Sequence, residues 1–320
     1  MKYFLMSLAV LTLFFNACAS KSDSTFMQAT RLVKENKFEA ALKLYNEILR
    51  QDPQYTSALI NRALVYEKLG EVDMATADYN KALELAPNQV DLLNNVAVFY
   101  LDQNRPQLAK YYLTKALEVQ PNYTIAYVNR AKANQMLNRL QDAKEDLDIA
   151  HGLEPQNIEI ILNKAILDYQ NFNFRAALDG YSEVLNSRPN DYKTYYRRGL
   201  AFLMLNTFQN AFNDFNTALS INNSYLPALF ARAELLFEQG DYEGALADLD
   251  TLKTIDNKYA AAYDFTGDIY AIEDPVKAVS NYIVARQLDP ANEKRYDAKI
   301  KLMASEKGRQ AVIKKRLERI

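Results

Sequence analysis

The chain has 320 residues, and 49% of them are apolar, so it contains enough apolar material to bury a substantial core. Its formal net charge of −2 argues against a nucleic-acid binder that works through charge. One cysteine and one histidine, Cys18 and His151, exclude a disulfide framework and a Cys/His zinc site. Glycine is scarce and Ala and Leu recur at helical spacing, which predicts helix throughout.

The chain begins with Lys2 and an apolar run over residues 3–15, which is typical of a secretory signal peptide. The run is shorter than the roughly 20 residues that a transmembrane helix needs. It ends at Ala17-Cys18, before a polar stretch, and this resembles the lipobox of bacterial lipoproteins. We therefore predict a signal peptide over 1–17, lipidation (palmitate included) at Cys18, and a tether over 18–23. An ordinary signal peptide with a chance cysteine is the alternative.

The lipobox resemblance also implies a location. In bacterial lipoproteins, a residue other than Asp after the cysteine, here Ala19, favours sorting to the outer membrane. The prediction is an outer-membrane lipoprotein of a bacterial cell envelope, facing either the periplasm or the cell surface. The membrane is then a partner through the lipid anchor, because acyl chains stabilise anchoring by about 0.8 kcal/mol for each buried methylene.

The chain repeats itself with a period of 34 residues. A first series of small residues includes Ala63, Ala97 and Gly199, a second includes Ala75 and Ala109, and prolines such as Pro87 close most units. These features resemble the tetratricopeptide repeat, which implies an all-α, right-handed solenoid superhelix of about eight helix hairpins. We place the repeat region at 24–292, with repeats at about 22–55, 56–89, 90–123, 124–157, 158–191, 192–225, 226–259 and 260–292, and a C-terminal capping helix at 293–320.

Four repeats carry an Arg before the first small residue, and the same four carry an Asp in the second helix. The other four repeats have neither residue, so the co-occurrence predicts a structural ion pair inside each repeat. The predicted pairs are Arg62 with Asp78, Arg130 with Asp146, Arg198 with Asp214, and Arg232 with Asp248.

The capping segment over 293–320 is expected to cover the apolar edge of the last repeat, as the ends of repeat arrays require. It carries ten Lys and Arg against four acidic residues. A solvated cap is the simpler interpretation of this charge, and a surface for anionic headgroups or an acidic partner is the alternative.

In the tetratricopeptide family, the first helices line the concave face. The sixth place of four successive repeats holds Asn, which offers both a donor and an acceptor to a peptide main chain. This resembles the asparagine ladder of O-linked N-acetylglucosamine transferase and implies peptide binding, although a solvated consensus residue is the alternative. The ladder residues are Asn61, Asn95, Asn129 and Asn163.

Lys193 and Arg197 stand where the family's carboxylate clamp has its lysine and arginine, and Asn163 matches the clamp asparagine. Val128 and Lys132 do not match the remaining two clamp positions, so the resemblance is partial. It implies contact with an acidic group or a C-terminal carboxylate. Aromatic residues continue the expected groove, and we predict that they are exposed for binding: Tyr169, Tyr196, Phe230, Phe237 and Phe265.

The sequence contains no catalytic constellation, phosphate loop or cofactor motif, so we predict a non-enzymatic protein without cofactors. Asn134 and Asp168 are unusual because sister repeats have an aromatic residue there; we expect Tyr169 to replace the missing ring, with a polar pocket as the alternative. The favoured function is a scaffold that binds an extended or C-terminal segment of a partner protein. A glycan or peptidoglycan binder and a self-associating homo-oligomer remain as alternatives.

Overall fold

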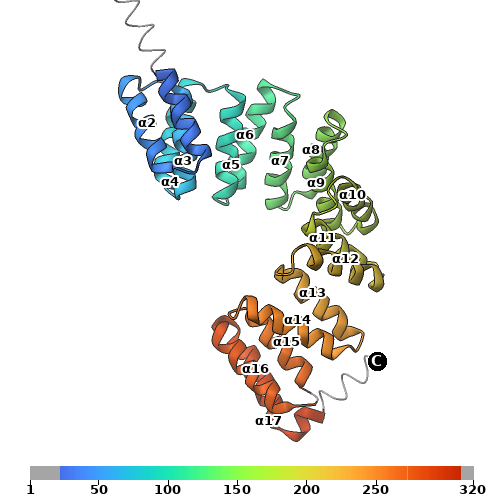
Figure 1. The fold of residues 1–320 in the computed structure, drawn as a ribbon. Helices are drawn as coiled ribbons and strands as arrows, with labels where there is room; N and C mark the ends of the chain where they lie inside the picture. Colours follow the sequence, from blue (N-terminus) through green and yellow to red (C-terminus); the bar gives the residue numbers. More distant parts are fainter. Residues whose placement is uncertain (1–21, 272, 311–320) are drawn as a thin grey trace, which may run out of the picture. The chain divides into compact units, whose positions relative to one another are not determined.

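The computed structural model describes residues 22–271 and 273–310, and every regular element in this part of the chain is a helix (Figure 1). The predicted signal peptide, Cys18 and residues 311–320 lie outside the described residues. The prediction of an all-α fold of helix hairpins is confirmed for the part described. None of its helices is both long and apolar enough to cross a membrane.

Unit 1, Met1–Ile160, contains four helix pairs. The first pair begins with a helix over 22–34, so Ser22 and Asp23, which the sequence analysis assigned to the tether, are helical. Its second helix is α2 (Phe38–Gln51). The following pairs are α3 (Thr56–Leu69) with α4 (Val72–Leu85), α5 (Val90–Asp102) with α6 (Pro106–Val119), and α7 (Thr124–Met136) with α8 (Leu140–Leu153).

Unit 2, Ile161–Ile320, begins within the first turn of α9 (Ile158–Gln170). Its pairs are α9 with α10 (Phe174–Ser187), α11 (Tyr192–Met204) with α12 (Phe208–Ile221), α13 (Leu226–Glu238) with α14 (Tyr242–Ile255), and α15 (Ala260–Tyr270) with α16 (Pro275–Leu288). A short 3-10 helix, η1 (Pro290–Asn292), leads into α17 (Glu293–Ala304). A second helical stretch begins at residue 306.

The turn inside a helix pair requires one residue with a left-handed backbone. Asn36, Asn104, Asn138 and Asn206 supply it with φ between 55° and 58°, and Gly70 and Gly240 do so at 78° and 84°. Asn and Gly adopt this conformation at low cost, which explains why these turns select them. Phe172 is the exception, with φ 61°.

The small residues of the 34-residue period lie where two helices touch. Ala63, Ala97 and Ala75 have no exposed surface. At Gly199, an added Cβ would lie 2.5 Å from Cε1 of Phe215 on α12, far inside contact distance. Only small side chains let the helices approach this closely, so the fold selects Ala and Gly at these places.

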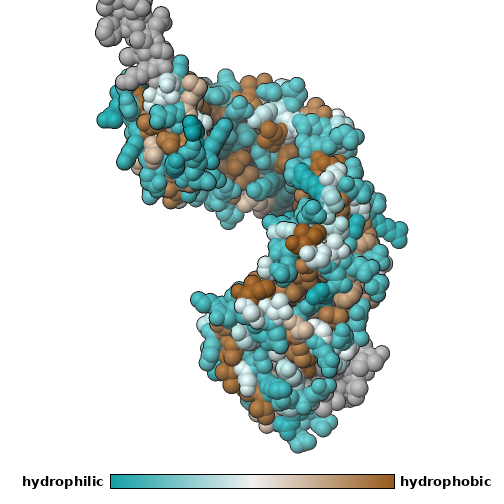
Figure 2. All heavy atoms as spheres, in the orientation of Figure 1, coloured by the Kyte–Doolittle hydropathy of each residue, from teal (hydrophilic) through white to brown (hydrophobic). Residues whose placement is uncertain are grey.

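The buried core runs through the helix pairs of each unit. Tyr45, Tyr79, Tyr181 and Phe215 are among its largest fully buried side chains. The surface in Figure 2 mixes hydrophilic side chains with separate apolar patches. Phe172 and Val276 are the most exposed large apolar residues of the described part, at 77% and 76%.

Candidate functional site

The four predicted Arg–Asp pairs all make contact, and each joins the two helices of one pair. The closest N–O distances are 2.6 Å for Arg62–Asp78, Arg130–Asp146 and Arg232–Asp248, and 2.8 Å for Arg198–Asp214. The aspartate side chains are only 5–8% exposed. In three pairs, two guanidinium nitrogens bind the two carboxylate oxygens separately, an arrangement that favours charge-assisted hydrogen bonds.

Hydrogen bonding to the aspartate raises the pKa of Arg62 and Arg198, and burial opposes this rise. The arginine therefore stays charged, and the buried carboxylate has a permanent counter-charge. This arrangement is structural, because both groups are occupied by each other.

Each of these arginines also makes a third contact, which the sequence analysis missed. Its Nη1 donates to a polar side chain of the second helix in the preceding pair: Asn46 at 2.6 Å, Thr114 at 3.4 Å, Ser182 at 3.1 Å and Asn216 at 2.6 Å. The acceptor always lies 16 residues before the arginine. That spacing was available in the sequence, and it links neighbouring helix pairs.

The predicted ladder asparagines of unit 1 do not behave alike. Asn61 and Asn95 are partly buried, and neither side chain makes a hydrogen bond within the described residues. Asn129 instead donates its amide to Oδ1 of Asn94 at 2.8 Å. The amide donor of Asn129 is thus already used inside the protein, and Asn94, not Asn95, is its neighbour across the repeats.

The remaining ladder and clamp residues lie in unit 2. Asn163 is partly buried on α9. Lys193 is exposed, with Nζ 5.9 Å from the centre of the Tyr192 ring. Arg197 is partly buried on α11 and pairs with no carboxylate in the part of the chain described.

Arg197 lies close enough to two tyrosines to influence them. Burial raises the pKa of Tyr181 and of Tyr225, and the positive charge of Arg197 opposes the rise at both. Tyr181 is fully buried, so only Arg197, which pairs with no carboxylate among the described residues, and the partly buried Tyr225 remain on this side. The guanidinium and the Tyr225 phenol can offer charge and hydrogen bonds to an incoming acidic group.

The prediction that the groove aromatics are exposed is wrong. Tyr196, Phe230, Phe237 and Phe265 are partly buried and pack against the apolar core of α11–α15. Ring centres lie 5.8 Å apart for Phe230–Phe265 and 5.2 Å apart for Phe237–Phe265. Tyr169 is also partly buried, against Ala165 and Tyr181. The rings pack because each lies beside an aromatic residue of its own or a neighbouring helix, which the repeat pattern alone does not show.

Asn134 belongs to the adjacent ion pair and does not open a binding pocket. It is 1% exposed, and its amide donates to Oδ2 of Asp146 at 3.0 Å, beside Arg130. Its Oδ1 has no hydrogen-bond partner among the described residues. Asp168 is partly buried on α9.

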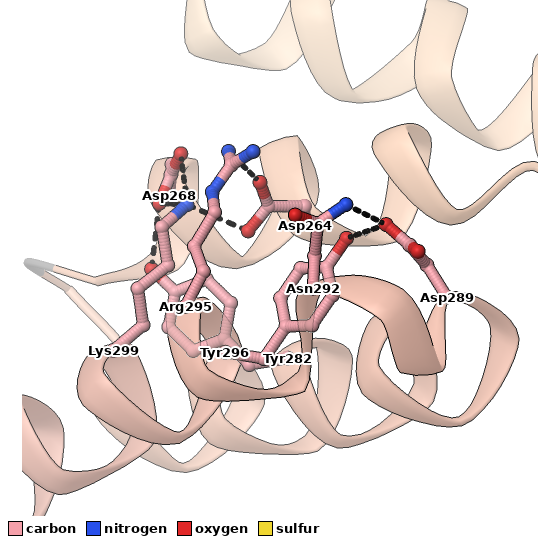
Figure 3. A network of polar contacts seen from close by, with 8 residues as sticks. All are labelled: Asp264, Asp268, Tyr282, Asp289, Asn292, Arg295, Tyr296 and Lys299. Atoms are coloured by element: carbon pink, nitrogen blue, oxygen red, sulfur yellow. Dashed lines mark hydrogen bonds and ion pairs between the residues drawn. The ribbon is translucent and has the colours of Figure 1, made fainter.

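The capping helix α17 is fastened to α15 by charge (Figure 3). Lys299 binds Asp264 at 2.6 Å and Asp268 at 2.8 Å, and Arg295 binds Asp264 at 2.5 Å. Tyr296 and Met303 are buried beneath the helix. The basic character that the sequence analysis assigned to solvent or to an anionic partner is thus partly used inside the protein, by Arg295 and Lys299.

The described residues contain no group of three side chains that could hold a metal ion. The arrangement observed is a set of helix faces with polar, charged and aromatic side chains.

Comparisons with known proteins agree with this fold. Models of the tetratricopeptide-repeat family match residues 26–90 and 90–123. The chain is a tetratricopeptide-repeat-containing protein. Repeats of this class support a role as a scaffold for protein–protein interaction.

One curated relative and several solved structures are similar to the chain. The tetratricopeptide repeat and J domain-containing co-chaperone DNJ1 of Cryptococcus neoformans is 32% identical over 67 residues, which span 21% of this chain and 13% of that protein. The crystal structure of a tetratricopeptide repeat protein from Parabacteroides merdae covers 77% of this chain and 98% of its own, with 16% identity and a TM-score of 0.63. Yeast Tom70 covers 91% of this chain and 65% of its own, with 20% identity and a TM-score of 0.59. At these identities the structures share the fold alone.

Proposed function

We propose that this protein is a non-enzymatic scaffold of a bacterial cell envelope, anchored by lipid at Cys18, and that its first helices bind an extended segment of a partner protein. The observation that carries the binding proposal is that Arg197 is partly buried and pairs with no carboxylate among the described residues. A partly buried guanidinium without a carboxylate partner is costly, and an acidic group of a ligand would relieve that cost.

The asparagines of unit 1 support the same proposal. Asn61 and Asn95 keep both the donor and the acceptor of their amide groups, because neither is used inside the described chain. An extended peptide presents an N–H and a C=O at every residue, so such amides bind main chain without reading side chains.

The experiment is a capture of partners from detergent-treated bacterial envelopes with the full chain as bait. The native chain is compared with Arg197→Gln and with the double variant Asn61→Ala, Asn95→Ala. Lys258→Gln, which removes one exposed charge, is the control. We expect a protein that the native chain and the control capture and that the Arg197 variant loses.

Capture that is equal in all variants would contradict the binding proposal. Binding of peptidoglycan fragments in place of protein would favour the glycan alternative, and a mass that rises with concentration would favour the homo-oligomer.

The anchor is tested separately with Cys18→Ala. We expect the variant to leave the membrane fraction or to remain unprocessed, because Cys18 is the only cysteine available for acylation. Unchanged membrane fractionation would contradict the anchor and leave the peptide proposal standing.

A further inference from the structure

An open cavity of about 640 Å³ lies in unit 1, between α2 and α3. Leu59 and Pro53 form part of its apolar wall, and Lys43, Asn46 and Arg50 line it with polar atoms. No acidic side chain belongs to its lining in the described part of the chain. The volume falls in the range of sites for small molecules, so the chemistry of the lining decides what the cavity can hold.

The polar side chains of this cavity are hydrogen-bond donors. Nη1 of Arg62 donates to Oδ1 of Asn46 at 2.6 Å, so the remaining group of this amide is its NH2 donor. That NH2 group and Nζ of Lys43 have no hydrogen-bond partner within residues 22–271 and 273–310. Over the same residues, the exposed Arg50 donates only from Nε, to the carbonyl oxygen of Asn46 3.3 Å away. A lining of donors without acceptors is suited to an anion.

Two of the cations at this cavity have no counter-charge. Asp78 neutralises Arg62, whereas Lys43 and Arg50 pair with no carboxylate among the described residues. The repeat does not require these two cations, because the six following repeats have no basic residue at either place. Those repeats hold Ala77 and Glu84, Tyr111 and Glu118, Glu145 and Gly152, Asp179 and Asn186, Asn213 and Ser220, and Ala247 and Thr254.

The cavity exists because Leu59 is shorter than the residue at its place in other helix pairs. Tyr127 and Tyr195 stand there in the fourth and sixth pairs, and each ring centre lies 5.5 Å from Cζ of the ion-paired arginine of its own helix. The second pair has a leucine in place of this ring, so the space beside its arginine stays open.

The cavity also lies beside the start of the described chain. The hydroxyl of Tyr55 donates to Oδ1 of Asp23 at 2.8 Å, and Pro53, which lines the cavity, stands two residues before Tyr55. Cys18 precedes Asp23 by five residues, a length of chain that reaches at most about 18 Å. A lipid anchor at Cys18 would therefore hold the cavity close to the membrane surface.

We propose that the cavity between α2 and α3 binds the phosphate headgroup of an anionic phospholipid in the membrane that holds the anchor. Lys43, Arg50 and the Asn46 amide donate to the phosphate oxygens, and the apolar wall contacts the glycerol carbons. A headgroup has a high effective concentration for a site tethered at the membrane, which favours it over a free anion. The inference rests on the proposed function, because the anchor at Cys18 selects a lipid.

The test uses the full chain with Cys18→Ala, which carries no acyl group, and two soluble short-chain lipids. Dihexanoyl phosphatidylglycerol is the anionic probe, and dihexanoyl phosphatidylcholine is its neutral match. Mass spectrometry measures how fast an amine reagent modifies Lys43, with the exposed Lys258 of unit 2 as the internal reference. The native cavity is compared with Arg50→Gln and with Lys34→Gln, a control that removes an exposed charge from the first helix pair. Circular dichroism verifies that each variant is folded.

We expect phosphatidylglycerol to protect Lys43 from the reagent and phosphatidylcholine to leave it reactive. Arg50→Gln should need about fivefold more phosphatidylglycerol for the same protection, and Lys34→Gln should behave like the native cavity. Equal effects of the two lipids, equal protection of Lys258, or an unchanged titration of Arg50→Gln would each overturn the inference.

Two further probes identify other occupants. Protection of Lys43 by inorganic phosphate at the same concentration would indicate a site for free anions. Protection by a polyglutamate peptide at a lower concentration would indicate an acidic protein partner. Either result overturns a lipid headgroup as the occupant.

A second arm uses the acylated full chain in vesicles of phosphatidylcholine, alone or mixed with an equal share of phosphatidylglycerol. We expect Lys43 to be protected in the mixed vesicles only, and equal reactivity in both would overturn the inference. If soluble phosphatidylglycerol protects Lys43 but Cys18→Ala leaves membrane fractionation unchanged, the headgroup site stands and the proposed anchor fails. If the anchor is confirmed but Lys43 reacts equally with and without the anionic lipid, the proposed function stands and this inference fails.

Discussion

The sixth helix pair, α11–α12, and the eighth, α15–α16, compensate a buried aspartate in different ways. In the sixth pair, Asp214 of α12 receives two hydrogen bonds from Arg198 of α11, and the same arginine reaches back to Ser182. In the eighth pair no arginine occupies that place, and Thr266 stands there. Its buried carboxylate, Asp264, receives its cations from α17, which lies outside the repeats.

This difference shows what an ion pair can do in a repeat protein. The arginine of the sixth pair joins three helices that recur along the chain, so the arrangement can be repeated. The cations of the eighth pair come from a segment that occurs once, so they fix the end of the array. Burying either carboxylate costs free energy. In the sixth pair an arginine of the repeat offsets this cost, and in the eighth pair the cations of α17 offset it.

The largest expected loss of stability comes from removing one of the four arginines that pair with an aspartate inside a repeat. Arg198→Ala leaves Asp214 buried without a counter-charge, and we expect the free energy of unfolding to fall by about 3–5 kcal/mol, measured by urea denaturation. Arg197→Ala, which changes the neighbouring residue on the same helix, is the control and should have a much smaller effect because no carboxylate of the described residues pairs with Arg197. Equal losses in the two variants would show that the ion pair is not the cause.

The cap offers the matching test in the eighth pair. Lys299→Met removes bonds to both Asp264 and Asp268, and we expect a loss of about 1.5–3 kcal/mol. Hydrogen exchange should locate the loss in residues 293–304, because α17 would detach before the repeats unfold. Lys301→Met, an exposed lysine on the same helix, should leave exchange unchanged; equal protection in both variants would contradict the role of the ion pairs.

The two pairs should respond alike where packing is concerned. Gly199→Ala and Gly267→Ala each drive a methyl group into a ring of the second helix, Phe215 and Tyr282, and we expect each to cost about 1–3 kcal/mol. In Gly152→Ala the new methyl meets no atom within 4 Å, so this helical substitution should raise stability by about 0.5–1 kcal/mol. Thermal unfolding of the three variants measures these changes. If all three variants lost stability, or all three gained it, the prediction would be wrong.

The smallest expected change in stability concerns the turns inside the helix pairs. These turns occur both in helix pairs that carry the arginine and in those that do not. Phe172→Asn places the usual residue at a left-handed position, and we expect a gain of about 1 kcal/mol in thermal unfolding because the Phe backbone is strained there. The reverse change, Asn206→Phe, should lose a similar amount. A loss on Phe172→Asn would mean that the contact of Phe172 with Phe174 outweighs the strain.

Much of the fold followed from the repeat period. Small residues every 34 positions required close helix crossings, and Asn or Gly at the turns permitted the left-handed backbone, so helix pairs and their turns were predictable. The four Arg–Asp pairs were predictable for the same reason, since the two residues occur together in the same four repeats and always at the same two places. The candidate site was predicted less well: Asn129 binds Asn94, and the groove aromatics pack against each other.

The sequence by itself determined which residues recur at the 34-residue period. Contacts between two recurring residues, such as the Arg–Asp pairs, could therefore be predicted from it. The tertiary structure alone decided the contacts made once, such as the seating of α17 on Asp264 and Asp268. The physical reason is that a contact made once depends on which helix faces lie against each other in space. A repeated contact has the same geometry in each repeat, so its residues recur at the period of the repeats and can be found in the sequence.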